Sequence, residues 1–183
     1  MASSTPTPAD GTPAPAEGAP PPAREPRQQV LSTIAEQVAA IDELVDIAEH
    51  SIRVFDDDLS QMGWNRPARA EKIAAFLRRS RAAKLDIIVH DTGWLESSAA
   101  RLMNLLRTFS GAITIYRTGA EAKAAMDPLI IVDNRHFLHR FHVEQPRAAL
   151  AIEEPHLARP LVDRFSEIWA TGEPGLSGTV LGL

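Results

Sequence analysis

The sequence predicts an α/β fold in which helices cover both faces of a mixed, mostly parallel sheet. Segments with helical periodicity alternate with short apolar segments between residues 28 and 116. Such alternation favours parallel strands joined by right-handed crossovers. The segment 85–90 is nearly all apolar, as buried parallel strands tend to be. Three short apolar segments then follow one another closely after residue 128, so we expect them to add antiparallel strands.

The first element that we expect is an amphipathic helix of about 20 residues, beginning near Gln28. Its apolar residues recur at three- and four-residue steps: Val30, Ile34, Val38, Ile41, Leu44, Val45 and Ala48. A strand over 51–55 and a second helix ending near Ser80 follow. The strand 85–90, a helix over 95–109 and a strand over 112–116 complete the alternating part.

The later elements are expected to be shorter and closer together. Strands are predicted over 129–132, 137–141 and 148–152, and a closing helix over 154–169. Gly172 and Pro174 end that helix, because both residues disfavour its continuation.

Composition divides the chain into three parts. Residues 1–27 hold eight of the 14 prolines, and such a segment buries too little apolar surface to become ordered. We therefore expect a disordered N-terminal tail, with docking to a proline-reading protein as the functional alternative. Residues 28–172 form the α/β domain, and residues 173–183, which are rich in glycine, form a flexible C-terminal tail.

Charge and residue usage exclude several classes of function. The net charge is −5, which argues against a broad nucleic-acid interface. The chain has no cysteine, so disulfides, thiol nucleophiles and cysteine zinc sites are excluded. No apolar run is long enough to cross a bilayer and no secretory signal is recognisable. We expect a cytoplasmic protein without a membrane association.

Candidate site residues lie where the parallel strands are expected to end. Ligands of open α/β sheets bind outside the carboxyl ends of such strands. Those ends carry the following residues: Asp56, His90, Asp91, Trp94 and Arg117. The pair His90–Asp91 is the most enzyme-like, because a carboxylate can orient an imidazole. Asp91 has a structural alternative, since it could cap the next helix or form a turn with Gly93.

Two other clusters resemble metal sites but do not predict one. His136, His139 and His142 lie on one predicted strand, where alternation puts His139 on the face opposite the other two. The three aspartates at 56–58 lack the spaced ligands and glycine of a calcium loop. We therefore expect no metal and no cofactor.

The run 127–133 (Asp-Pro-Leu-Ile-Ile-Val-Asp) is similar to the strand that carries the motif His-x-Lys-x4-Asp in the phospholipase D superfamily. Aligned on Asp133, the motif histidine falls on Met126 and the motif lysine on Pro128. The order of elements over about 30–170 also resembles one half of a phospholipase D-like protein, including the closing helix with Phe165 and Trp169. The chain is similar to uncharacterised phospholipase D-like domains of proteobacteria.

The resemblance implies a phospholipase D-like half domain that forms a two-fold homodimer. In active members one motif histidine attacks phosphorus, the other acts as general acid, and the lysines bind the phosphate oxygens. Met126 can neither attack phosphorus nor act as a general acid, and Pro128 has no cation to bind phosphate oxygens. Both substitutions argue against phosphodiesterase activity. The dimer interface should lie near Asp133 and its strand.

Three functional hypotheses follow from the sequence. The first is a non-catalytic phospholipase D-like domain that acts in binding or protein interaction. The second is a hydrolase or transferase with a relocated site at the strand ends, built on His90, Asp91 and Arg117, with His136 as a further member. The third is a weak nucleic-acid binder that uses the following arginines: Arg78, Arg79, Arg81 and Arg101. We expect Asp133 to pair with Arg117 or Arg135, either as a remnant of the motif or as a structural ion pair.

Overall fold

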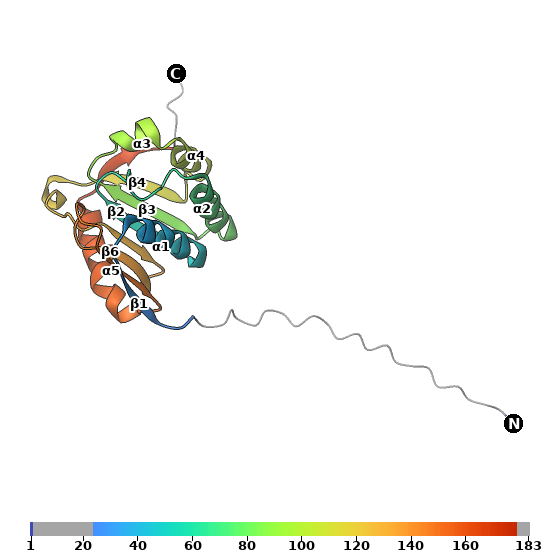
Figure 1. The fold of residues 1–183 in the computed structure, drawn as a ribbon. Coiled ribbons are helices and arrows are strands. Elements are labelled where there is room, and N and C mark those ends of the chain that lie inside the picture. The colour runs from blue at the N-terminus through green and yellow to red at the C-terminus, as the bar shows by residue number, and fades with distance from the viewer. Residues whose placement is uncertain (2–23, 179–183) are drawn as a thin grey trace, which may run out of the picture.

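A computed structural model describes Met1 and residues 24–178. The predicted tail over residues 1–27 and the end of the C-terminal tail therefore lie largely outside the described residues. Within the described part the chain forms one eight-stranded sheet with helices on both faces (Figure 1). The α/β fold and its two-sided helical cover, both expected from the sequence, are confirmed.

The strands follow the order β1-β7-β6-β5-β2-β3-β4-β8 across the sheet. Their bounds are β1 Arg27–Leu31, β2 Ser51–Asp56, β3 Lys84–Val89, β4 Ile113–Arg117, β5 Leu129–Val132, β6 His136–Arg140, β7 Ala148–Ile152 and β8 Glu173–Leu176.

The prediction of a mostly parallel sheet is wrong. Among the described strands only β2, β3 and β4 pair in parallel, whereas the five other pairings are antiparallel. Only two connections, β2 to β3 and β3 to β4, carry the helical crossover that a parallel pair of neighbours needs. Each remaining strand runs antiparallel to the strand beside which it is added.

Two apolar clusters fix the helices to the two faces. The helices α1 Ile34–Ile47, α2 Pro67–Arg79, α3 Gly93–Ser98 and α4 Ala100–Thr108 contribute to one cluster. The helix α5 Pro155–Ala170 packs on the opposite face, where Ala122 of the short 3-10 helix η1 Ala120–Ala122 joins the same cluster. Strand residues alternate between the clusters, so that Val54 and Ile87 face α1 and α2 whereas Phe55 and Ile88 face α5.

The first predicted helix begins too early. Residues 27–31 form the edge strand β1, and α1 starts only at Ile34. Its start is set by a capping box, in which the Thr33 side chain accepts the N–H of Glu36 and the Glu36 carboxylate accepts the N–H of Thr33. The Thr-x-x-Glu pattern could have marked this boundary, but the helical spacing of Val30 concealed it.

Two further elements depart from the sequence predictions. The helix expected over 95–109 is broken at Ala99, whose backbone lies outside the helical region. Residues 173–176, assigned from composition to a flexible tail, form strand β8 beside β4. Pro174 and a register shift between Ile115 and Tyr116 make this edge of the sheet irregular.

Candidate functional site

The carboxyl ends of the three parallel strands meet at one edge of the sheet. Asp56 ends β2, Arg117 ends β4, and His90 and Asp91 follow β3 directly. The register pairs Asp56 with Val89 and Val89 with Arg117, so these residues lie on neighbouring strands. The strand-end placement of Asp56, His90, Asp91 and Arg117 is as the sequence predicts.

The imidazole of His90 is fully engaged inside the protein. Its Nε2 lies 2.7 Å from the carbonyl oxygen of Ala125, and its Nδ1 lies 2.6 Å from Oγ1 of Thr118. Because a carbonyl only accepts, Nε2–H donates to Ala125, and Nδ1 of the neutral ring accepts the Thr118 hydroxyl. His90 is buried and packs edge-on against Phe55. Neither ring nitrogen remains for a substrate.

The expected His90–Asp91 pair does not form. The Asp91 carboxylate accepts the backbone N–H of Gly93 at 2.8 Å, which is the turn that the sequence left open as an alternative. Arg117 is exposed and pairs with Glu173 at 3.2 Å. Trp94 is the second residue of α3 and packs partly buried against the larger apolar cluster. These residues share an edge without converging on a common point.

Sequence reasoning missed the residues that close this edge. Thr118 and Lys123 belong to the connection between β4 and β5, and Lys123 donates to the carbonyl oxygen of His90 at 2.7 Å. No periodicity or motif marks either residue, because their partners lie about 30 residues away in the chain. Only the folded connection brings them to His90.

Asp56 lies in the most unusual electrostatic environment of this edge. It is buried, and its carboxylate accepts the N–H of Asp57 at 2.8 Å. Burial raises the pKa of Asp56 from 3.8 to about 7, although that hydrogen bond and the charge of Arg140 act in the opposite direction. The charge of the Asp56 carboxyl therefore changes near neutral pH.

A small cavity adjoins Asp56 at the start of β5. Its volume is about 10 Å³, and Gln37, Pro128 and Arg140 belong to its lining. Arg140 donates from Nε to the carbonyl oxygen of Gln145 and from Nη1 to Oε1 of Gln61. The side-chain amide of Gln37 is buried and bonds to no other described group. The cavity is polar on one side, yet it is far smaller than a usual small-molecule site.

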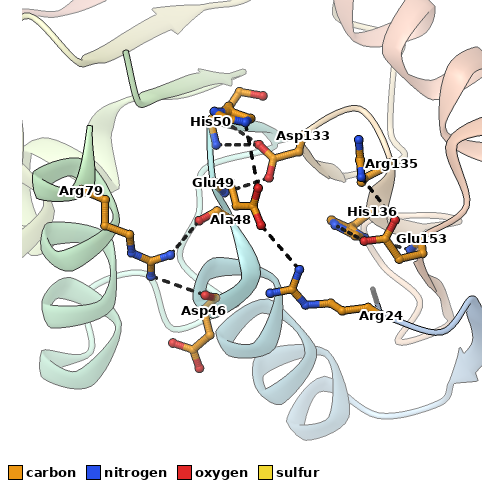
Figure 2. Close-up of polar contacts among 11 residues, drawn as sticks. Arg24, Asp46, Ala48, Glu49, His50, Arg79, Asp133, Arg135, His136 and Glu153 are labelled. Atoms are coloured by element: carbon orange, nitrogen blue, oxygen red, sulfur yellow. Dashed lines mark hydrogen bonds and ion pairs between the residues drawn. The ribbon is translucent and has the colours of Figure 1, made fainter. Parts of the chain in front are cut away.

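Asp133 lies at the opposite end of the sheet. Its carboxylate accepts the backbone N–H groups of Glu49, His50 and Ser51, each at 2.8 Å. Figure 2 shows the side chain directed at this turn between α1 and β2. The expected pairing with Arg117 or Arg135 does not occur, since Arg117 pairs with Glu173 and Arg135 with Glu153. Asp133 has a structural role in this chain.

His136 lies beside Asp133 and not with His90. It begins the antiparallel strand β6, opposite Val132, so the prediction that it joins the strand-end group is wrong. Its Nδ1 accepts the N–H of Glu153 at 2.9 Å, and its Nε2 lies 3.5 Å from Oε1 of Glu153 (Figure 2). Burial lowers the pKa of His136.

A further cluster on the α5 face was also missed. The Asp127 carboxylate accepts Nε–H of Arg164 at 2.7 Å and is 3.2 Å from Nε2 of His139. Burial alone would raise the pKa of Asp127, but the hydrogen bonds from His139 and Arg164 outweigh burial and lower it to about 2. The alternation expected for this strand does place His139 on the face opposite His136, because the neighbouring Phe137 and Leu138 pack in different clusters.

Among the described residues no group of three or more histidines and carboxylates is arranged to hold a metal ion. Within the same residues no helix is long and apolar enough to cross a membrane.

The buried carboxyl of Asp56 makes stability depend on pH. Because its pKa is about 7 in the folded chain and about 3.8 in the unfolded chain, the folded state loses stability as pH rises from about 4 to 7. Replacing Asp56 by Asn should therefore raise the free energy of unfolding at pH 8, by up to about 4 kcal/mol, and change it little at pH 4. Urea unfolding at the two pH values measures this, with Asp57→Asn at an exposed neighbour as the control. Equal effects of Asp56→Asn at both pH values would contradict the assignment.

The three hydrogen bonds of Asp133 should contribute strongly to stability. Asp133→Ala leaves three backbone N–H groups without their acceptor, so we expect a loss of about 2 to 4 kcal/mol in the free energy of unfolding. Glu49→Ala, which removes exposed contacts with Arg24 and His50, should cost less than about 1 kcal/mol. Thermal and urea unfolding compare the two variants. A similar small loss in both would show that the turn holds without Asp133.

Three solved structures share this fold. The chain is similar to TrmBL2, an archaeal chromatin protein that binds DNA, with 15% identity and a TM-score of 0.60 over 81% of this chain and 54% of that one. It is similar to Nuc from Salmonella typhimurium, a phospholipase D family member, with 21% identity and a TM-score of 0.59 over 84% and 100% of the two chains. NucT from Helicobacter pylori gives 13% identity and a TM-score of 0.54 over 82% and 100%. The chain thus spans about half the length of TrmBL2, and these likenesses show the fold alone.

No curated protein matches the chain in sequence. One family model does match, over residues 33–177, which is nearly the whole described part. The chain has a phospholipase D-like fold and belongs to the family described as domain of unknown function DUF7931.

Proposed function

We propose that this chain is a non-catalytic phospholipase D-like domain that acts by binding, as a homodimer in the cytoplasm. The observation that carries the proposal is the start of β5. When the sequence is aligned with the superfamily motif on Asp133, which directly follows β5, the motif histidine and lysine fall on Met126 and Pro128, just before the strand.

The chemistry of Met126 and Pro128 supports a loss of activity. A thioether neither attacks phosphorus usefully nor transfers a proton, and proline carries no cation to bind phosphate oxygens. Pro128 contributes its carbonyl oxygen to the N–H of Arg140 at 2.9 Å and lines the small cavity beside Asp56. These positions therefore serve packing and strand pairing.

The neighbouring polar groups do not replace the lost motif. His90 uses both ring nitrogens internally, and Arg140 is committed to Gln145 and Gln61. The alternative enzyme, with a relocated site at His90 and Asp91, has less support because Asp91 forms a turn. His136 lies at the wrong end of the sheet for that site.

One observation favours nucleic-acid binding as a second candidate. Arg78 and Arg101 line the same surface groove of about 550 Å³ between α2 and α4. Glu71 lies in the same lining and the chain is acidic overall, so the binding would be weak and would fall steeply with salt. A salt-independent signal with single-stranded and duplex DNA would remove this candidate.

The proposal predicts no phosphodiesterase activity. Purified wild-type protein should hydrolyse bis(p-nitrophenyl) phosphate no faster than buffer, with and without divalent cations, because no motif nucleophile is present. An active phosphodiesterase run in parallel controls the assay. Turnover by the wild type that disappears in His90→Ala would overturn the proposal and restore the relocated site. Turnover that His90→Ala and Asp56→Asn both leave unchanged would point to a contaminant.

The proposal also predicts a homodimer with its interface near Asp133. Sedimentation at micromolar concentration should give a dimer. Arg135→Glu, on the exposed turn after Asp133, should weaken the dimer by about tenfold or more, because it reverses a charge within the expected interface. Arg107→Glu on the exposed side of α4 is the matched charge reversal and should leave the dimer unchanged. A monomeric wild type would contradict the expectation taken from the superfamily.

A further inference from the structure

A groove opens on the α5 face of the sheet, beside the edge strand β1. Its volume is about 400 Å³, and β1, β6, β7 and α5 all contribute to its lining. On this face β7 presents only the methyl groups of Ala149 and Ala151, which form the floor of the groove. These small side chains leave space beside α5. Leu157 and Leu161 form the wall on the side of α5.

The lining is apolar and partly open to water. Val30 and Leu157 belong to it, and they are 57% and 44% exposed. They are two of the few large apolar side chains that the described residues leave exposed. Exposed apolar surface that rims a hollow is typical of a binding site.

Beside Gln28 and Gln29 of β1, His139 is a polar residue of this groove. It lines the hollow from β6, and its Nε2 lies 3.2 Å from the carboxylate of Asp127. The same carboxylate is held by Nε and Nη2 of Arg164. The ring of Phe141 packs edge-on against the imidazole at 5.7 Å between centroids. The imidazole is therefore held by two contacts, one with the Asp127 carboxylate and one with the Phe141 ring.

The Asp127 carboxylate decides which ring nitrogen of His139 carries the proton. Since the pKa of Asp127 is about 2, the carboxyl is ionised at neutral pH and can only accept hydrogen bonds. Nε2 must therefore carry a hydrogen and donate it to Asp127, which leaves Nδ1 of the neutral ring as an acceptor. No other described residue bonds to this Nδ1.

We propose that the groove binds a small, largely apolar molecule through one hydroxyl group, which donates a hydrogen bond to Nδ1 of His139. Alcohols and phenols have this chemistry. A carboxylate fits less well, because an ionised carboxylate has no hydrogen to donate to Nδ1. The volume suits a ligand at the lower end of the usual range of about 300 to 1,000 Å³. The inference deepens the proposed binding function by naming a ligand class.

The test uses 4-butylphenol and its methyl ether, 4-butylanisole, as matched probes. Calorimetric titration of the full chain should give a Kd for the phenol about tenfold or more below that for the ether, because only the phenol can donate to His139. The nitrogen NMR signal of His139 Nδ1 should move on addition of the phenol and not of the ether. Equal binding of the two probes, or no saturable binding of the phenol at millimolar concentration, would overturn the proposal.

Three variants locate the site. His139→Phe should reduce phenol binding to the level of the ether, and Ala151→Leu should remove the binding of both probes by filling the floor. His156→Phe, at an exposed histidine in the first turn of α5, is the control and should bind the phenol as the wild type does. If a groove variant does not fold, the comparison of phenol with ether on the wild type still decides.

The outcome is separable from that of the proposed function. If the protein has no phosphodiesterase activity and does not bind the phenol, only the assignment of the ligand class is contradicted. If the protein hydrolyses phosphodiesters, the proposed function is contradicted, whether or not the phenol binds.

Discussion

The carboxylate of Asp133 holds together two turns that come from distant parts of the chain. It accepts three backbone N–H groups from the turn between α1 and β2, and its own N–H donates to the carbonyl oxygen of Ser51. Asp133 and Asn134 both adopt positive φ, at 52° and 59°, which makes the tight reversal from β5 to β6. This contact fixes the register of β5 against β2, with Val132 opposite Ile52. The register in turn brings the start of β5 to the far end of the sheet, beside Asp56 and the cavity.

Strand interiors were predictable because they depend on local apolar patterns. The segments that became β3, β5 and β7 all have nearly continuous apolar residues. The strand directions were not predictable, because direction depends on how each connection folds back. The prediction of parallel strands holds only around β3, where helices separate neighbouring strands. The edge strands β1 and β8 were missed because Val30 fits a helical spacing and Pro174 with Gly175 resembles a loop.

The candidate site shows the same division between local and long-range information. The sequence places Asp56, His90 and Arg117 at strand ends correctly, because strand ends follow from strand positions. It cannot show that His90 bonds to Thr118 and Ala125, since these partners depend on the fold of the connection between β4 and β5. The adjacency of His90 and Asp91 was misleading because each side chain has its own partners: His90 bonds to Thr118 and Ala125, whereas the Asp91 carboxylate accepts the N–H of Gly93. The pair of Asp127 and His139, 12 residues apart, arises only from the pairing of β5 with β6.

The two edges of the sheet differ in whether another strand could be added. On one side Pro174 lacks an N–H and the register of β8 shifts against β4, so this edge offers an interrupted row of hydrogen-bonding groups. On the other side β1 is regular over its five residues and contains no proline. Growth of the sheet from one molecule to the next would thus be confined to a single edge. Contacts of that kind close after two copies, because each copy uses its one open edge, and they do not propagate into fibres.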